Sequence, residues 1–188
     1  MSKSKVCSVE KAGGLDNKFR RFLQNPKKIL KPYIREGMTV LDLGCGPGFF
    51  TLEISKMTGV SGKVIAADLQ EGMLQKVKDK ITGTPLEQII SLHKCEENKI
   101  GLNETVDFVL AFYFVHEVPD QDVLFKEIYT ILKSGGEMLI VEPPFHVSKA
   151  GFNEMLTKIE NAGLEIISEP KSFLNKEVLL KKIESPKL

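Results

Sequence analysis

The stretch VLDLGCGPGFFTLEI, residues 40–54, places three glycines at alternate positions directly after a short apolar run. Residues 38–43 have the apolar density of a buried parallel strand, and Gly44, Gly46 and Gly48 follow at its end. Glycine lets the chain turn sharply and leaves the backbone amides uncovered by a side chain. Ligands of open α/β sheets bind beyond the carboxyl ends of the strands, so we expect this loop to bind one.

Strands and helices alternate along the rest of the chain. Apolar runs typical of strands occupy residues 38–43, 62–67, 89–93, 106–112, 137–141, 164–168 and 177–183. Helices are predicted between them, over residues 49–57, 73–80, 123–132 and 148–162, the third stopped by Ser134-Gly135-Gly136. This alternation is typical of βαβ units, in which a parallel sheet carries helices on both faces.

The first 36 residues have a different pattern. Residues 1–14 end in two glycines and are interpreted as a flexible arm. An amphipathic helix is predicted next, from apolar residues at i, i+4, i+7 and i+8: Leu15, Phe19, Phe22 and Leu23. Pro26 fits the first turn of a second helix, which carries Tyr33. We therefore divide the chain into an arm and helical cap over residues 1–36 and a domain over residues 37–188, which together form one compact unit.

Composition and charge exclude several classes of protein. The chain has 188 residues, 42% hydrophobic and 27% charged, which is typical of a globular domain. The net charge of +1 gives no reason to expect DNA as a partner. Residues 1–36 nevertheless carry ten Lys/Arg against three Asp/Glu, which indicates a solvated basic helix or a surface for an acidic partner or membrane lipid.

The cysteines and the hydropathy pattern add further expectations. Cys7, Cys45 and Cys95 are odd in number and far apart, so neither a disulfide framework nor a metal site is expected. No apolar run approaches 18 residues and the N-terminus is polar and lysine-rich, which predicts no transmembrane segment and no signal peptide. We therefore expect a cytoplasmic protein, with a homo-oligomer possible.

The glycine loop itself narrows the choice of ligand. No Gly-Lys-Ser/Thr follows the glycines, which excludes a phosphate loop. A dinucleotide is disfavoured because Phe49 stands where the Gly-x-Gly-x-x-Gly fingerprint needs its third glycine, and Pro47 removes an amide. Asp68 ends the second predicted strand, 24 residues after Gly44, at the spacing of an acid that binds both hydroxyls of a ribose.

Four segments carry a resemblance to a known family: VLDLGCGPGFFT, VIAADLQEGML, VDFVLAFYFVHEVPD and LKSGGEMLIVEP. They resemble the successive motifs of class I S-adenosylmethionine (SAM)-dependent methyltransferases, over residues 38–141 and more weakly to residue 183. The likeness is greatest to the small-molecule branch that includes the ubiquinone/menaquinone C-methyltransferases. The resemblance implies a Rossmann-like, seven-stranded, mostly parallel sheet with an antiparallel last strand.

The resemblance also implies the cofactor and its contacts. Asp42 would lie near the methionine amino group, Asp68 would take the ribose hydroxyls, and Leu69 would cover the adenine. The acid that receives the adenine amino group corresponds to Glu96, although Lys94-Cys95-Glu96-Glu97-Asn98 departs from the usual Gly-Asp-Ala. The full set expected to contact SAM is Asp42, Gly44, Cys45, Gly46, Asp68, Leu69, Glu96, Glu97, Ala111 and Phe112.

Methyl transfer from a sulfonium is an in-line displacement, for which the protein mainly supplies alignment and a dry site. A general base is needed only where the acceptor loses a proton. His116 and His146 are the candidate catalytic residues, with Glu117 nearby, although either histidine could orient the substrate or hold a loop. Three aromatic residues of the cap could close over the methyl group or simply pack on the sheet: Phe19, Phe22 and Tyr33.

The sequence therefore predicts a SAM-dependent methyltransferase with an unidentified, small-molecule acceptor. Two alternatives remain open, namely a methyltransferase that acts on protein or RNA through the basic N-terminus, and a SAM-binding protein without catalysis.

Overall fold

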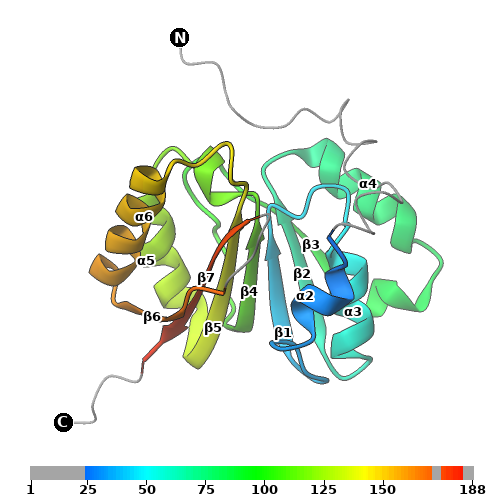
Figure 1. The fold of residues 1–188 in the computed structure, drawn as a ribbon. Helices are drawn as coiled ribbons and strands as arrows, with labels where there is room; N and C mark the ends of the chain where they lie inside the picture. Colours follow the sequence, from blue (N-terminus) through cyan, green and yellow to red (C-terminus); the bar gives the residue numbers. More distant parts are fainter. Residues whose placement is uncertain (1–23, 171–174, 184–188) are drawn as a thin grey trace.

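The computed structural model describes residues 24–170 and 175–183 of the chain. Within these residues, seven strands form one sheet in the order β3-β2-β1-β4-β5-β7-β6 (Figure 1). The strands are β1 (Thr39–Leu43), β2 (Lys63–Asp68), β3 (Ile90–Lys94), β4 (Val106–Phe112), β5 (Leu132–Glu142), β6 (Leu164–Ser168) and β7 (Lys176–Lys182). All seven predicted strands are therefore present; β4 and β6 have the predicted bounds, and the ends of the others are shifted by at most five residues.

The sheet is parallel from β3 to β5 and antiparallel beyond it. β1 pairs in parallel with β2 on one side and β4 on the other, and β7 runs antiparallel to both β5 and β6. The predicted α/β fold, with a mostly parallel sheet and a reversed last strand, is confirmed. The strand order changes direction at β1, and ligands of such sheets bind at this point beyond the carboxyl ends of the strands.

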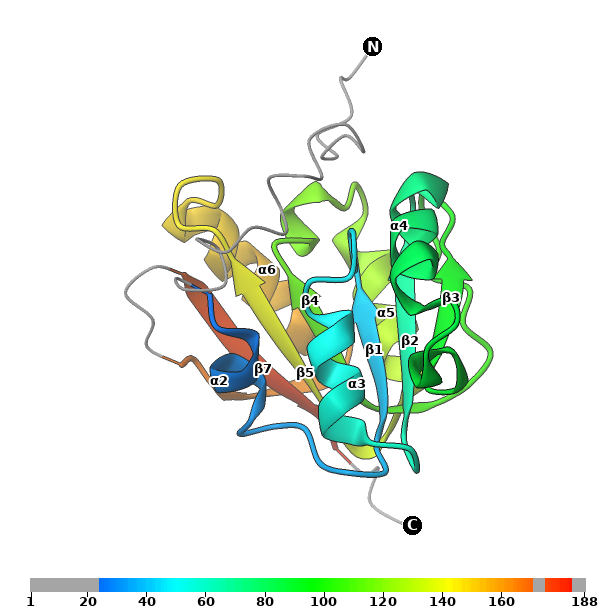
Figure 2. The same cartoon turned by 90° about the vertical axis from the view of Figure 1, so that its right-hand side faces the viewer.

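Helices cover both faces of the sheet (Figure 2). One face carries α2 (Pro26–Leu30), α3 (Thr51–Thr58) and α4 (Glu71–Ile81), and the other carries α5 (Gln121–Ile131) and α6 (Lys149–Asn161). Two 3-10 helices, η2 (Pro85–Gln88) and η3 (Val115–Glu117), lie in the connections. Polar side chains before several helices accept hydrogen bonds from backbone amides of the first turn and so fix where those helices begin. Asp120, for example, accepts the amide hydrogen of Val123 at 3.0 Å.

The core consists of two apolar clusters, one on each face of the sheet. Successive strand residues point to opposite faces, so Leu41 and Val109 pack in the cluster beneath α5 and α6, while Val40 and Phe108 pack in the cluster beneath α3 and α4. Both faces of β1 and β4 are therefore buried. This explains why these strands read as continuous apolar runs rather than alternating ones.

The region between α5 and β5 differs from the prediction. The helix ends at Ile131, and the strand begins at Leu132 instead of residue 137. Leu132 pairs with Val106, and the register then shifts before Glu137 pairs with Phe108. The extra residues form a bulge in which Gly135 has a φ of 74°. The glycines that were expected to separate helix from strand therefore lie within the strand itself.

The N-terminal prediction is tested only in part. The predicted arm, the helix from Leu15, and the residues Phe19 and Phe22 lie outside the described residues. The second predicted helix is present as α2 but ends at Leu30, before Pro32, so Tyr33 follows the helix and does not belong to it. The division into a cap and a domain at residue 36 stays a prediction.

Candidate functional site

The glycine loop folds against the end of β2. The amides of Gly44 and Cys45 both donate to the carbonyl of Ala67, at 2.9 and 3.0 Å. The amide of Gly48 donates back to the carbonyl of Cys45 at 3.1 Å and closes a turn. The chain therefore leaves β1, crosses to the neighbouring strand and turns into α3.

Gly44 and Gly46 are both left-handed, with φ values of 73° and 53°, but their surroundings are opposite. A Cβ at Gly44 would lie 2.3 Å from the Phe114 ring, so that ring covers the glycine directly. A Cβ at Gly46 would meet no atom within 4 Å, so the backbone there faces open space. The loop thus offers a bare stretch of backbone at Gly46, beside a wall formed by Phe114.

Asp68 closes the other side of the loop. Its side chain is 8% exposed; one carboxylate oxygen accepts the amide of Gly46 at 2.9 Å, and the other accepts the amide of Gln70 at 2.8 Å. Burial raises the pKa of Asp68, although the amide hydrogen bonds and Lys94 counteract this rise. Each carboxylate oxygen has two acceptor sites, so the group retains acceptors for the two hydroxyls of a ribose. These residues therefore fit the nucleoside part of SAM.

Asp42 lies beneath the loop at the end of β1. It is 2% exposed and accepts the hydroxyl of Thr51, the first residue of α3, at 2.6 Å. Cys45 is close to both acids, and the pKa of its thiol is raised well above the ordinary value by burial first, and then by the charges of Asp42 and Asp68. Asp42 is thus placed to fix the helix start and to supply negative charge below the loop.

At the end of β3 the arrangement differs from the one the resemblance implies. Glu96 and Glu97 are exposed in a tight turn that is closed by backbone hydrogen bonds between Glu96 and Lys99. The ammonium of Lys94 instead donates to the carbonyl of Leu69, at 2.5 Å, and the Cys95 amide donates to the carbonyl of Asp68, at 3.0 Å. Lys94 and Cys95 therefore lie beside Asp68 and Leu69, and the sequence prediction missed both.

Cys95 itself is buried. Desolvation, with the charge of Asp68 next, raises the pKa of its thiol to about 12. A thiol with a raised pKa stays protonated, so this side chain presents a neutral, apolar surface next to Asp68.

Aromatic side chains gather at the end of β4. Ala111 is fully buried, and Phe112 is 7% exposed. The Phe112 ring lies 4.4 Å from that of Phe50 at the start of α3, and also 4.4 Å from that of Tyr113, measured between centroids. These rings form an apolar wall that continues from the glycine loop.

A further pair of residues meets near the ends of two neighbouring strands: His116 lies in η3, shortly after β4, and Glu142 is the last residue of β5. The Nδ1 atom of His116 lies 2.5 Å from Oε2 of Glu142, and the His116 amide donates to Oε1 of the same carboxylate at 3.2 Å. The Glu142 side chain is 1% exposed and the His116 side chain is 15% exposed. The His146 ring lies 5.7 Å from the His116 ring, so the structure brings the two candidate histidines together.

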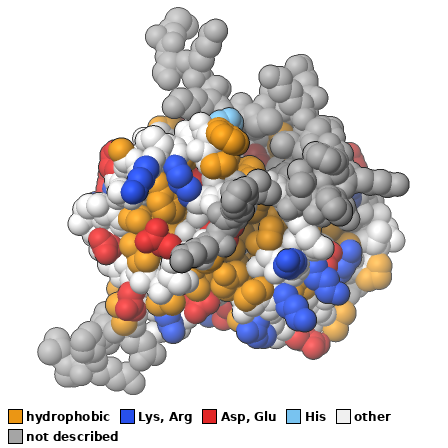
Figure 3. Space-filling model, viewed as in Figure 1, with side chains coloured by type: hydrophobic (Ala, Val, Ile, Leu, Met, Phe, Trp, Pro, Cys, Tyr) orange, Lys and Arg blue, Asp and Glu red, His pale blue; other side chains and the backbone are white. Residues whose placement is uncertain are grey.

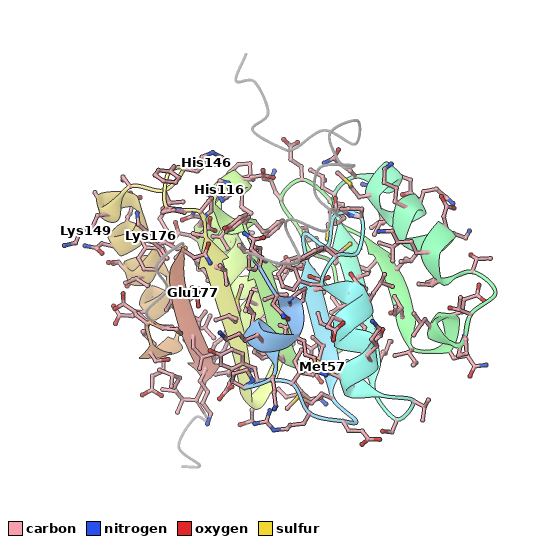
Figure 4. All side chains as sticks on the ribbon, turned by 45° about the vertical axis from the view of Figure 1, so that its right-hand side comes forward. Met57, His116, His146, Lys149, Lys176 and Glu177 are labelled. Atoms are coloured by element: carbon pink, nitrogen blue, oxygen red, sulfur yellow. The ribbon has the colours of Figure 1, made fainter. Side chains whose placement is uncertain are left out.

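Both histidines lie at the same end of the sheet as the glycine loop, opposite Met57 (Figure 4). Hydrophobic side chains gather beside a histidine at this end of the surface (Figure 3). Phe145, which precedes His146 in the sequence, is 95% exposed. The candidate acceptor side of the site therefore combines imidazole, carboxylate and apolar groups.

Tyr33 lies away from the glycine loop and packs on the sheet, which is one of the two roles that the sequence left open for it. Its ring stacks on Phe108 with the centroids 5.7 Å apart, and it lines a surface hollow together with Met38, Asp107 and Glu137. These residues belong to the amino-end halves of their strands or precede them. The short helix α2 ends at Leu30, and the turn that follows places Tyr33 on the sheet.

Two further predictions concern metals and membranes. Within the described ranges there is no cluster of three or more His, Cys, Asp or Glu side chains suited to a metal ion. Across the same residues, no helix combines the length and apolar character needed to cross a membrane.

The fold, the glycine loop and the buried acid at the end of β2 define a class I SAM-dependent methyltransferase. The chain belongs to the family described as "Methyltransferase domain", whose profile matches residues 34–179. The resemblance found in the sequence is therefore confirmed, together with the enzyme class.

Individual relatives agree with this assignment. The chain is 35% identical over 118 residues to a demethylmenaquinone methyltransferase from Lactobacillus johnsonii, and 32% identical over 112 residues to the ubiquinone/menaquinone biosynthesis C-methyltransferase UbiE from Escherichia coli. These matches cover 62% and 58% of the chain but 48% and 44% of the relatives, so the chain spans about half of their length. The crystal structure of a SAM-dependent methyltransferase from Aquifex aeolicus superposes with a TM-score of 0.85 at 30% identity, covering 95% of this chain and 100% of that one.

Proposed function

We propose that the enzyme transfers the methyl group of SAM to a small molecule that loses a proton in the reaction, with His116 as the proton acceptor. The observation that carries this proposal is the His116–Glu142 pair beside the glycine loop. A buried carboxylate at 2.5 Å from Nδ1 is an acceptor, so Nδ1 carries the imidazole proton and donates it to Glu142. In this tautomer Nε2 is the ring nitrogen that accepts a proton, and it is proposed to take the proton that the methyl acceptor loses.

The Glu142 carboxylate also stabilises the imidazolium that forms when His116 takes a proton. Its second hydrogen bond, from the His116 amide, fixes the position of the ring relative to the backbone. The pair therefore has the features of a general base whose orientation and tautomer are set by a buried partner.

For the cofactor, we assign the ribose hydroxyls to Asp68. We assign the bare backbone at Gly46 to contact with the ribose ring and the methionine part. The bound SAM supplies an activated methyl group on a sulfonium. Asp42, Ala111 and Phe112 are assigned to the methionine end, and Leu69, with Lys94 and Cys95 beside it, to the adenine. Alignment of the acceptor with this methyl group contributes roughly 7–11 kcal/mol to lowering the barrier.

The aromatic wall supports an acceptor with a flat, apolar part. The rings of Phe112 and Tyr113 contact each other at the end of β4, and the exposed Phe145 directly precedes His146. The names of the two curated relatives, which refer to demethylmenaquinone and to ubiquinone and menaquinone, favour a small molecule over a macromolecule. His146 is proposed to contact the acceptor rather than to take its proton, because the buried carboxylate partners His116.

A transfer experiment tests this proposal. The wild-type protein is incubated with tritiated SAM and a metabolite extract, a protein fraction and an RNA fraction, and the label is followed into each. We expect the label in small molecules, and we expect His116→Gln to remove it. His93→Gln is the matched control, because the imidazole of His93 contacts the carbonyl of Ile100 in the connection after β3.

Other outcomes would point to the alternatives. Label in protein or RNA that disappears when the positive charges of residues 1–36 are removed would favour a macromolecular acceptor. Binding of SAM without labelled product in any fraction would favour a SAM-binding protein without catalysis.

A further inference from the structure

Tyr113 has an unusual backbone conformation at a critical place. Its φ of 58° makes it the single non-glycine residue with a positive φ in the part of the chain that the structure describes. An aromatic residue adopts the left-handed region only where its surroundings hold it there. Tyr113 is the first residue after β4. It lies between Phe112, which belongs to the aromatic wall, and Phe114, whose ring covers Gly44 of the glycine loop.

Contacts from three other parts of the chain converge on this residue. Its amide donates to the carbonyl of Val141 in β5 at 2.7 Å. Its hydroxyl accepts from the side-chain amide of Gln24 at 2.8 Å and donates to the side-chain oxygen of Asn175 at 2.5 Å. The phenol therefore joins the segment before α2 and the segment before β7 to the end of the central strand.

The left-handed residue redirects the chain. In a regular strand, successive side chains would continue to alternate between the faces of the sheet. The turn at Tyr113 instead places the Phe114 ring over Gly44 and leads the chain into η3, where His116 meets Glu142. One backbone conformation thus determines a contact on the cofactor loop and a contact on the proposed base.

We propose that Tyr113 is a positioning residue whose hydroxyl holds this turn and thereby sets both Phe114 against the cofactor loop and His116 against Glu142. It does not take part in the chemistry itself. The part of the inference that concerns His116 rests on the proposed function, whereas the part that concerns Phe114 and the cofactor loop does not.

The test uses Tyr113→Phe, which keeps the ring and removes the hydrogen bonds of the hydroxyl with Gln24 and Asn175. Tyr129→Phe is the matched control, because that tyrosine lies on α5 with its ring against Gly163 and the Lys182 ammonium. Two quantities are measured in the full chain. The first is the dissociation constant of S-adenosylhomocysteine, the demethylated cofactor. The second is the tautomer of His116, from the imidazole nitrogen resonances, which are assigned by their loss in His116→Gln.

We expect Tyr113→Phe to weaken cofactor binding by about threefold or more, the scale of a lost hydrogen bond. We also expect its His116 resonances to move from the Nδ1–H form towards the average of a free imidazole. Tyr129→Phe should leave both quantities unchanged. If Tyr113→Phe does not fold, Tyr113→Asn tolerates the left-handed conformation and lacks the phenol, and the same changes are expected there.

Unchanged cofactor affinity and an unchanged His116 tautomer in a folded Tyr113→Phe protein would overturn the proposal. Neither measurement requires the methyl acceptor. A wild-type protein that transfers no methyl group to small molecules would therefore count against the proposed function alone, and would leave the role of Tyr113 to be decided by these two readouts.

Discussion

The carboxylate of Asp68 accepts the backbone amide of Gly46 at 2.9 Å, so the acid at the end of β2 and the glycine loop after β1 are held together directly. The residue assigned to the ribose thus also maintains the loop that is assigned to the rest of the cofactor. Burial raises the pKa of this carboxyl, so keeping it ionised lowers the stability of the folded protein.

The raised pKa makes the contribution of Asp68 to the free energy of unfolding depend on pH. In the folded state the carboxyl binds its proton more tightly than in the unfolded state, so its contribution to the free energy of unfolding falls as pH rises from the unfolded pKa through the raised folded pKa. Urea unfolding at a series of pH values should therefore show the wild type losing stability relative to Asp68→Asn as pH rises through this window. A wild type that gains stability over the variant in the same window would contradict the expectation.

The two left-handed glycines of the loop should respond differently to alanine. Gly46→Ala introduces only the backbone cost of a left-handed alanine, about 1–2 kcal/mol, because its Cβ meets open space. Gly44→Ala adds a clash with Phe114, so we expect a larger loss of unfolding free energy. Chemical denaturation of both variants measures the difference. Equal losses would show that Phe114 yields freely and does not form a fixed wall of the site.

Substitutions of His116 and Glu142 should have different effects on the kinetics of methyl transfer. His116→Gln removes the proposed base and is expected to lower kcat/KM by roughly 100-fold or more. Glu142→Gln keeps the base but removes the adjacent negative charge, so the acidic limb of the pH–rate profile should move to lower pH. His93→Gln serves as the control. An unchanged pH profile in Glu142→Gln would show that the carboxylate does not act through His116.

Tyr33 is expected to matter for stability and not for cofactor binding. Tyr33→Ala loses its stack on Phe108, and such pairs contribute about 0.5–1.5 kcal/mol beyond the buried area. The unfolding free energy should fall by at least this amount, while the affinity for S-adenosylhomocysteine stays at the wild-type value. A marked loss of affinity in a folded Tyr33→Ala protein would instead support the lid role that the sequence suggested.

The sequence predicted the elements that consecutive residues encode, namely the strands and the loops that directly follow them. Apolar runs and spacing reveal β1, the glycine loop and Asp68, because the loop directly follows its strand and the acid ends the next one. The same logic could have found Glu142, an acid at the end of an apolar strand just before Pro143-Pro144. Its pairing with His116, however, depends on β4 and β5 being neighbours, and local sequence does not encode that.

Other features arise only from tertiary contacts. The left-handed conformation of Tyr113 coincides with hydrogen bonds to Gln24 and Asn175, 89 and 62 residues away in the sequence. The position of Lys94 at Leu69 likewise depends on how the turn after β3 closes, which leaves Glu96 exposed. The assignment of Glu96 to the adenine, which rests on the spacing of a family motif, stays a prediction.

Titration calorimetry of S-adenosylhomocysteine into the wild type and Asp68→Ala tests the central claim most directly. We predict saturable binding of one equivalent to the wild type. We predict at least roughly tenfold weaker binding to the variant, since it loses charge-assisted hydrogen bonds to the ribose as well as the bond that holds Gly46. Absence of binding to the wild type, or equal affinity in the two proteins, would contradict the assignment of this loop and acid as the cofactor site.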